Sequence, residues 1–338
     1  MPRRRDILDY RVAQTIEALT RRSTEDDEAS PAIRWYARYI GTGERNLYKL
    51  VQRALSYGFK FGISLNYERI GINMLITIGD TIDLDLPMKM SAKTLDGKEL
   101  KMFYMPLVCM NDVIDKLSRE NVEYYLNRIL WGSRPALASI PFLDLKPVSE
   151  ISGETEEKMT KIAAEIYQEG PPRIWGRRYP LDKVLLAILD EADEDSIKSM
   201  AAIARELGIE TPKAQRKYYN MWSRRVILGY RLRYAPYFGR NHVLAVVSTP
   251  EPLRLSYALP VLPPVVFATV SPDPVTGRER VIVSITGEGD MISSTLRIVK
   301  KLGGNIDTMY YYYEVDKGKE ERLSKKILSM PGDLECPH

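Results

Sequence analysis

Cysteine and histidine, which serve in many metal sites and in much acid–base catalysis, are scarce in this sequence. The 338 residues include two cysteines, Cys109 and Cys336, and two histidines, His242 and His338. With so few thiolate and imidazole ligands, we expect neither a structural zinc finger nor an iron–sulfur cluster within one chain. We therefore expect no catalytic residue, no metal-binding residue and no cofactor, and the chain is predicted not to be an enzyme.

The residues that stand out are basic, and they gather in two segments. Residues 34–69 contain seven basic and two acidic side chains, and residues 205–240 contain nine basic and two acidic ones. Because the whole chain has a net charge of +4, the rest of it is net acidic. Lysine and arginine on an exposed helix can neutralise phosphates and reach base edges in a major groove. The sequence thus predicts double-stranded DNA as a partner, with a solvated basic face as the alternative.

Both basic segments belong to an internal repeat with an offset of 167 residues. Over 31 aligned positions seven residues are identical, among them Gly41 with Gly208 and Tyr67 with Tyr234. Each copy then continues into apolar runs typical of strands. A long internal period of this kind indicates a duplicated structural unit.

The first part of each copy has the periodicity of three helices followed by a tight β-hairpin. In the first copy we expect helices over 7–19 and 33–40 and a third helix that directs Leu47, Val51 and Ala54 inward. In the second copy we expect a helix around 181–189, another over 197–207, and a third that begins near Thr211 and buries Ala214, Tyr218 and Met221. This order is that of a helix-turn-helix with a wing.

The third helix of each copy and its wing supply the predicted DNA contacts. In the first copy these are Arg45, Lys49 and Arg53. In the second copy Lys213, Arg216 and Lys217 are assigned to the groove, and Arg224, Arg231 and Arg233 to nearby phosphates. Trp222 is assigned to packing.

The second part of each copy predicts a sheet with crossing helices. β-Branched and aromatic runs at 243–247, 265–270, 281–285 and 306–315 predict strands, with a helix over 291–302. In the first copy Asp96-Gly97 predicts a hairpin turn between strands over 88–92 and 100–107, and a helix is expected over 111–130. In the second copy Pro250 and Pro252 interrupt the segment where the first crossing helix should lie. In the first copy the corresponding segment is only residues 81–86. We expect these two helices to be short or lost.

Two short motifs resemble the feast/famine regulators of the Lrp/AsnC family. Leu207-Gly208-Ile209, followed after sixteen residues by Val226-Ile227-Leu228-Gly229-Tyr230, is similar to the end of that family's winged helix-turn-helix. Ile70-Gly71-Ile72-Asn73 and Phe238-Gly239-Arg240-Asn241 are similar to the start of its effector domain. The resemblance implies a ferredoxin-like βαββαβ domain after each winged helix, and hence a tandem duplication that forms a single-chain pseudo-dimer.

The expected fold is α+β, with two winged helix-turn-helix domains alternating with two ferredoxin-like (βαββαβ) domains. A charged helix over 154–169 is expected within a linker between the copies. The expected boundaries are 1–70 and 179–239 for the winged helices, 71–147 and 240–318 for the ferredoxin-like domains, 148–178 for the linker and 319–338 for a C-terminal tail.

Three features of the second copy have both a functional and a structural interpretation. Gly287-Glu288-Gly289-Asp290 lacks the lysine of a P-loop, so we favour a strand-to-helix turn with Asp290 at the helix N-terminus. Tyr310 to Tyr313 are expected to alternate across a strand at an interface. The domain plan also resembles that of certain siroheme decarboxylases, which implies histidines near a tetrapyrrole. For His242, at the start of a strand, we favour a structural role.

These patterns favour a DNA-binding transcriptional regulator or architectural relative. A winged-helix module that binds other proteins and a siroheme-decarboxylase-like enzyme are the alternatives. A homo-oligomer formed through the ferredoxin-like domains is a further option, and a small-molecule effector is left open. Because no apolar run reaches the roughly 18 residues of a membrane helix, we expect a cytoplasmic protein without a membrane partner.

Overall fold

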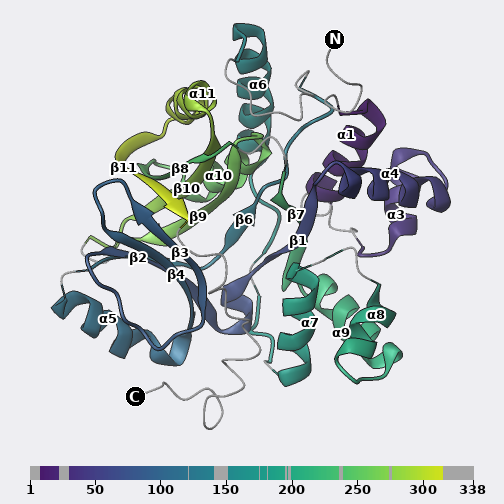
Figure 1. Ribbon diagram of the computed structural model, residues 1–338, viewed down its shortest axis with the longest axis horizontal. Coiled ribbons are helices and arrows are strands. Elements are labelled where there is room, and N and C mark those ends of the chain that lie inside the picture. The colour runs from purple at the N-terminus through teal and green to yellow at the C-terminus, as the bar shows by residue number, and fades with distance from the viewer. Residues whose placement is uncertain are drawn as a thin grey trace.

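The computed structural model describes residues 8–22, 30–120, 122–140, 151–174, 176–180, 182–194, 196, 199–235, 239–273 and 276–314. Its mixture of helices and antiparallel sheets confirms the expected α+β fold. Figure 1 shows the strands of the large sheet on the left and two helical units on the right. The C-terminal tail, with Cys336 and His338, lies outside the described residues, as do several positions inside the expected segments. The expected domain boundaries stay predictions.

Each winged-helix unit consists of helices followed by one strand. The first contains α1 (Tyr10–Glu17) with a π-helical extension (Ala18–Arg22), α3 (Ile33–Ile40), α4 (Glu44–Ser56) and β1 (Lys60–Leu65). The second contains α7 (Lys183–Glu194), α8 (Met200–Glu206), α9 (Thr211–Ser223) and β7 (Ile227–Tyr234). The turns after α3 and α8 place Gly41 and Gly208 at φ values of 70° and 64°, a left-handed conformation that favours glycine.

The inward faces of the third helices agree with the sequence prediction. All six expected core positions are buried, with at most 4% of any side chain exposed: Leu47, Val51, Ala54, Ala214, Tyr218 and Met221. Trp222 is 4% exposed, so its assignment to packing is confirmed. Helical periodicity predicts these positions because one helix face contacts its neighbours at every third or fourth residue.

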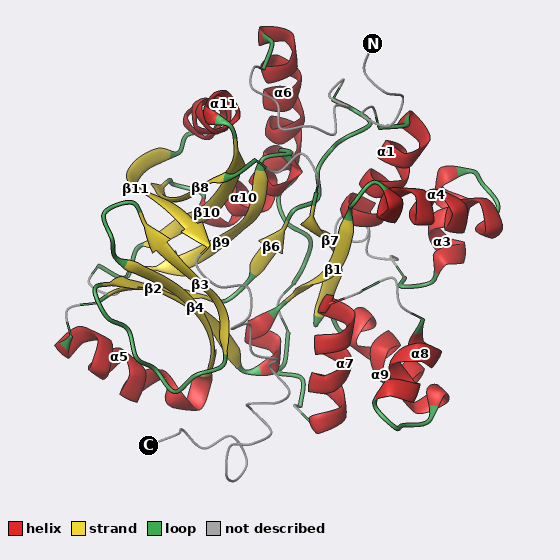
Figure 2. Ribbon diagram, viewed as in Figure 1, coloured by secondary structure: helices red, strands yellow, loops and turns green. Residues whose placement is uncertain are grey.

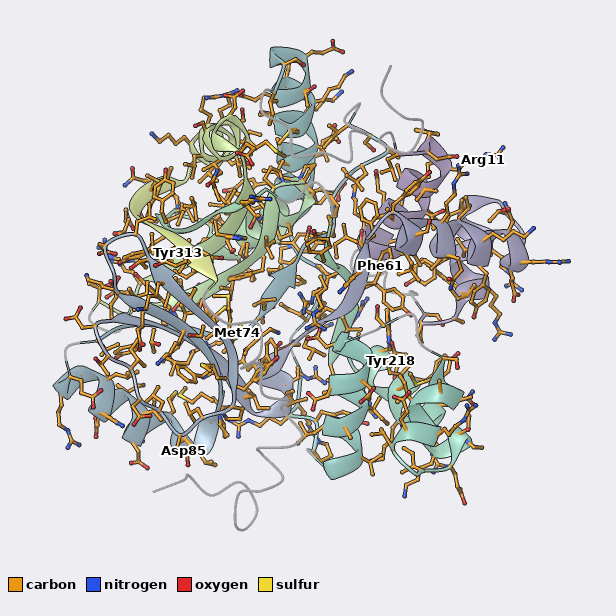
Figure 3. All side chains as sticks on the ribbon, in the orientation of Figure 1. Arg11, Phe61, Met74, Asp85, Tyr218 and Tyr313 are labelled. Carbon is orange, nitrogen blue, oxygen red and sulfur yellow. The ribbon has the colours of Figure 1, made fainter. Side chains whose placement is uncertain are left out.

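The expected hairpin wings are wrong. Instead of folding back on its own copy, β1 pairs antiparallel with β7, so one strand from each unit forms a two-stranded ribbon. Figure 3 shows Phe61 of this ribbon beside the helical units, and its side chain is 2% exposed. Pairing between the copies buries apolar side chains of both strands, which a free wing would leave in water.

The two ferredoxin-like domains join edge to edge into one nine-stranded sheet. The first contributes β2 (Ile72–Gly79), β3 (Met88–Thr94), β4 (Glu99–Pro106), β5 (Glu123–Asn127) and β6 (Leu130–Gly132). The second contributes β8 (Asn241–Ser248), β9 (Val265–Pro272), β10 (Glu279–Gly287) and β11 (Asn305–Glu314). The strand order is β5-β2-β4-β3-β11-β8-β10-β9-β6, so β2 to β5 have the same internal order as β8 to β11, and the copies meet at β3 and β11. The short strand β6 of the first copy pairs with β9 at the far edge of the second.

One expectation for the crossing helices needs correction. The helix expected over 111–130 is shorter: α5 covers Met110–Arg119, and β5 then pairs with β2. The aromatic run within β5 has high strand propensity, and an open sheet edge is available for it. The other two crossing helices are short or absent, as expected. In the second copy Pro252 starts the short helix α10 (Pro252–Ala258), because the first turn of a helix needs no proline N–H. No helix is assigned at 81–86 in the first copy.

Helices cover the sheet on the side away from the winged-helix units (Figure 2). The remaining elements are α11 (Gly289–Lys301) and the linker helix α6 (Gly153–Glu169), which is tied to α11 where Glu156 accepts hydrogen bonds from Arg297 and Lys301. Along β8, Leu244 and Val246 belong to the core shared with the winged helices, whereas Val243, Ala245 and Val247 belong to the core beneath α6 and α10. Strand alternation therefore buries this part of the sheet on both faces.

Candidate functional site

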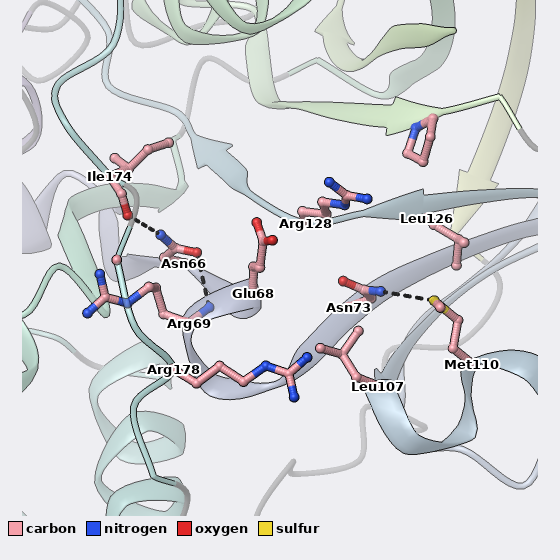
Figure 4. A pocket seen from close by; sticks show the side chains of 12 residues that line it. Asn66, Glu68, Arg69, Asn73, Leu107, Met110, Leu126, Arg128, Ile174 and Arg178 are labelled. Carbon is pink, nitrogen blue, oxygen red and sulfur yellow. Dashed lines mark hydrogen bonds between the residues drawn. The ribbon is translucent and has the colours of Figure 1, made fainter. Parts of the chain in front are cut away.

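A pocket of about 470 Å³ lies where the linker crosses the first ferredoxin-like domain. Figure 4 shows its side chains, which come from the segment after β1, the start of β2, the region around β5 and the linker. The lining residues are Asn66, Glu68, Arg69, Asn73, Leu107, Met110, Leu126, Arg128, Ile174, Gly176, Arg178 and Pro272. Three of them are arginines and one is a carboxylate, so the lining has a net positive charge. Pockets of this volume are typical of small-ligand sites.

The short 3₁₀ turn Tyr67–Ile70 positions one wall of the pocket. Its N-cap residue Asn66 accepts a hydrogen bond from Arg69 N at 3.3 Å and donates one to the Ile174 carbonyl at 3.1 Å. The Arg69 carbonyl in turn accepts a hydrogen bond from Tyr179 N at 2.6 Å. Because Asn66 is 1% exposed, these bonds tie the linker firmly to the turn.

The three arginines face the pocket without acidic partners. Within the described part of the chain, no ion pair or side-chain hydrogen bond joins Arg69, Arg128 or Arg178 to another residue. Burial, and after it the positive charge of Arg224, lower the pKa of the Arg69 guanidinium below its usual value. The region around the pocket therefore has a positive potential that favours anions. Guanidinium groups bind carboxylates and phosphates through paired N–H donors.

Gly176 of the linker packs directly against one of these guanidinium groups. A Cβ atom at this position would lie 2.1 Å from Arg69 Nη1. Only a residue without a side chain leaves Arg69 in its place. The linker thus shapes the pocket as well as covering it.

Three polar atoms of the lining are buried and lack a hydrogen-bond partner among the described residues. They are Glu68 Oε2, Arg69 Nε and Asn73 Oδ1. Most buried polar groups in proteins are hydrogen-bonded, so several such atoms around one cavity indicate a place for a polar ligand.

Two other cavities are weaker candidates. One of about 230 Å³ between the winged-helix units is lined mainly by aromatic and apolar groups, including Tyr218 and Tyr230. Another of about 490 Å³ contains Glu17 and Arg21, but these two pair with each other at 2.9 Å. Neither cavity gathers several arginines that lack an acidic partner.

The residues predicted to contact DNA lie on α4 in the first copy, and on α9, directly after α9 and on β7 in the second. In the first copy Arg45, Lys49 and Arg53 are exposed on α4, as expected, although Arg53 pairs with Asp9 at 2.9 Å. In the second copy α9 exposes Lys213 and Arg216, whereas Lys217 is half-buried and pairs with Asp182. Their contact with DNA stays a prediction that the fold does not test.

The wing residues of the second copy differ from the expectation. Arg231 was expected at the surface, but its side chain is 8% exposed and it donates hydrogen bonds to Asp193 at 2.7 Å and to the Ile63 carbonyl at 2.9 Å. Pairing of β1 with β7 encloses this position, so Arg231 cannot reach a phosphate. Arg233 is half-buried, and Arg224 is exposed near Arg69.

Sequence reasoning missed the arginines of the pocket. Arg69 was counted only as part of a basic segment, Arg128 was placed in a helix, and Arg178 was assigned to a spacer. The signal that could have pointed to Arg178 is the pair Arg177-Arg178 after Gly170-Pro171-Pro172. On a helix, a basic residue can pair with an acidic residue three or four positions away, and a segment that is not helical offers no such partner.

The structural interpretations of the second copy agree with the structure. Asp290 lies in the first turn of α11 and accepts a hydrogen bond from Ile151 N at 3.0 Å. Tyr312 is 7% exposed, whereas Tyr311 and Tyr313 are 43% and 50% exposed. His242 lies at the start of β8, with Nδ1 2.9 Å from Thr286 Oγ1 and its ring stacked on Tyr312. His242 is not part of the arginine-lined pocket.

No helix among the described residues is long and apolar enough to cross a membrane.

The fold is similar to that of a solved enzyme. A crystal structure of the siroheme decarboxylase NirDL matches with a TM-score of 0.50 at 11% identity, over 93% of this chain and 98% of that chain. A second structure of it, in complex with an iron-uroporphyrin III analogue, matches with a TM-score of 0.49 at 9% identity, over 93% of this chain and 94% of that chain. No family model and no curated protein matches the sequence.

This similarity corrects two expectations. The chain was predicted to be a DNA-binding transcriptional regulator and not an enzyme, whereas the solved structure with a TM-score of 0.50 is that of a siroheme decarboxylase. A basic helix can accompany either function, because charge and periodicity describe a surface and not the ligand it binds. At this identity the similarity supports an Lrp/AsnC-like fold of winged helices and ferredoxin-like domains.

Proposed function

We propose that this chain is a siroheme-decarboxylase-like enzyme that binds a polycarboxylate in the arginine-lined pocket and acts at one of its carboxyl groups. The observation that carries the proposal is the meeting of Arg69, Arg128 and Arg178 around one cavity, without acidic partners among the described residues. The fold that the chain shares with a siroheme decarboxylase supports it. A decarboxylase needs a carboxylate-binding site, and this pocket has the donors for one.

The arginines would position the substrate rather than break its bonds. Decarboxylation breaks the bond between a carboxyl carbon and its neighbour, releases CO₂ and leaves an electron pair that takes up a proton. Guanidinium groups that hold the other carboxylates fix the orientation of the reacting one. Their fixed positive charges also favour binding of a multiply charged anion from water.

Siroheme is the first compound to test, because it is the substrate named for the structural neighbour. Purified protein is incubated with siroheme without oxygen; its absorption spectrum reports binding, and mass spectrometry of the product reports loss of CO₂. We expect Arg69→Met, Arg128→Met and Arg178→Met each to weaken binding about tenfold or more, since a charged hydrogen bond contributes about 1.5–3 kcal/mol. Arg119→Met, which removes the same charge from the exposed end of α5, is the matched control.

Two results together would rule out the proposal. The first is that neither siroheme nor a smaller tricarboxylate binds to the wild-type protein. The second is that any carboxylate binding that does occur is the same in the three pocket variants and in Arg119→Met. Conversion of siroheme with loss of CO₂, reduced in the pocket variants alone, would support it.

We further infer that the chain arose as a fused duplication of the Lrp/AsnC-like unit. The repeated strand order on either side of the β3–β11 junction supports this. We also propose that the protein is cytoplasmic. We propose further that its chains associate through their ferredoxin-like domains. The oligomeric state follows from light scattering of the purified protein, and a monomer at all concentrations would contradict the association.

A further inference from the structure

The pocket is lined by hydrogen-bond acceptors as well as by the arginines, which are hydrogen-bond donors. Glu68 Oε2 and Asn73 Oδ1 are buried oxygen atoms without a hydrogen-bond partner among the described residues. An ionised carboxylate and an amide oxygen are hydrogen-bond acceptors. A carboxylate of a ligand is itself an acceptor, so it can satisfy the arginines but not these two atoms.

Both acceptors are held in place by the backbone around them. Glu68 lies in the 3₁₀ turn, and its N–H donates to the Arg128 carbonyl at 3.2 Å. Asn73 is the second residue of β2, is 4% exposed and has its amide nitrogen 4.0 Å from Met110 Sδ. In Figure 4 the two side chains lie between Arg128 and Arg178, and the Asn73 oxygen is on the side of Glu68. The acceptors and the guanidinium groups of Arg128 and Arg178 therefore line the same space.

We infer that the ligand of this pocket carries a hydroxyl or amine donor next to its carboxylates, and that Glu68 and Asn73 recognise this donor. The inference rests on the proposed function, because it concerns the same pocket, and it narrows the substrate class to hydroxy- or amino-polycarboxylates. Siroheme has neither donor, so conversion of siroheme in this pocket would support the proposed function and overturn the inference. A buried acceptor without a partner disfavours any ligand that lacks the donor, so the pocket discriminates between compounds that differ by one such group.

Citrate and tricarballylate test this directly, because they have the same three carboxylates and differ by one hydroxyl. Calorimetry with the full-length wild-type protein should show citrate binding at least tenfold more tightly than tricarballylate. Aspartate and succinate form the corresponding pair for an amine. If the citrate-to-tricarballylate affinity ratio is the larger of the two, the donor is a hydroxyl. If the aspartate-to-succinate affinity ratio is the larger, the donor is an amine.

Variants assign the discrimination to the proposed residue. Glu68→Met should bring the citrate-to-tricarballylate ratio close to one, and it should strengthen tricarballylate binding because a negative charge near the carboxylates is removed. Arg128→Met should weaken both compounds by a similar factor and leave the ratio unchanged. If Glu68→Met does not fold, as judged from its melting curve, Glu68→Gln is used. Glu68→Gln keeps the shape of the side chain and should lower the citrate-to-tricarballylate affinity ratio by a smaller factor than Glu68→Met does.

The outcomes separate this inference from the proposed function. Suppose that binding depends on the arginines but that citrate and tricarballylate bind equally well, and aspartate and succinate bind equally well. This result would overturn the inference and leave the proposed function intact. A ratio that is unchanged in both Glu68 variants would also overturn it. If no carboxylate binds in an arginine-dependent way, the proposed function fails and the inference fails with it.

Discussion

Replacing Asp193 by asparagine should destabilise the protein strongly. Asp193 of α7 accepts a hydrogen bond from Arg231 Nη2 at 2.7 Å, and its other carboxyl oxygen lies 3.6 Å from Lys89 Nζ. Asp193 lies on α7, Arg231 on β7 and Lys89 on β3. Their contacts therefore connect the second winged helix with the ribbon and with the large sheet. Gly132 leaves room for the arginine, since a Cβ atom there would lie 2.2 Å from Arg231 Cδ.

The magnitude follows from the burial of the pair. The Arg231 and Asp193 side chains are 8% and 19% exposed. Burial alone would raise the pKa of the Asp193 carboxyl, but the charges of Arg231 and Lys89 outweigh it and hold that pKa well below its usual range. Removing one partner of a buried ion pair costs about 3–5 kcal/mol, because the other charge stays buried without compensation. At about 2 °C per kcal/mol for a large domain, Asp193→Asn should lower Tm by about 6–10 °C.

Thermal unfolding followed by circular dichroism measures this change. Glu154→Gln, which removes an exposed ion pair with Lys158 on α6, should leave Tm nearly unchanged. The double variant Asp193→Leu with Arg231→Met should recover most of the loss, because the buried arginine is removed together with its partner and the remaining cation, Lys89, is 20% exposed. A Tm change for Asp193→Asn no larger than that of the control, or a double variant less stable than the single one, would refute the reasoning.

Two further predictions concern the linker. The hydrogen bond from Arg297 lowers the pKa of Glu156 from 4.5 to about 2, so this contact stabilises the fold above pH 4.5 and the stabilisation is lost as the pH falls through about 2. The stability difference between wild type and Glu156→Gln, measured by urea unfolding, should be constant above pH 5 and shrink below it; a difference that does not change with pH contradicts this. Gly176→Ala should displace Arg69 and weaken tricarboxylate binding about tenfold with little change in Tm. Unaltered affinity in calorimetry would show that Arg69 does not contact the ligand.

The elements and their inward faces could be predicted from the sequence to a large extent. Helical spacing identified Leu47, Val51 and Ala54 as core, and strand periodicity predicted that the tyrosines at 310–313 alternate between the two faces of the sheet. These patterns are local, because each is set by the geometry of one helix or one strand. The strand at Glu123–Asn127 was missed because short apolar and aromatic runs occur in both helices and strands.

The amino-acid sequence by itself indicated the α+β composition, the internal repeat and the position of most helices and strands. Only the tertiary structure decided which charges are free. Arg231 looks like a surface residue in the sequence, but pairing of β1 with β7 buries it against Asp193. Arg69, Arg128 and Arg178 come from separate segments that meet around one cavity. Whether an arginine is paired or available depends on contacts between distant segments, and no local pattern encodes those contacts.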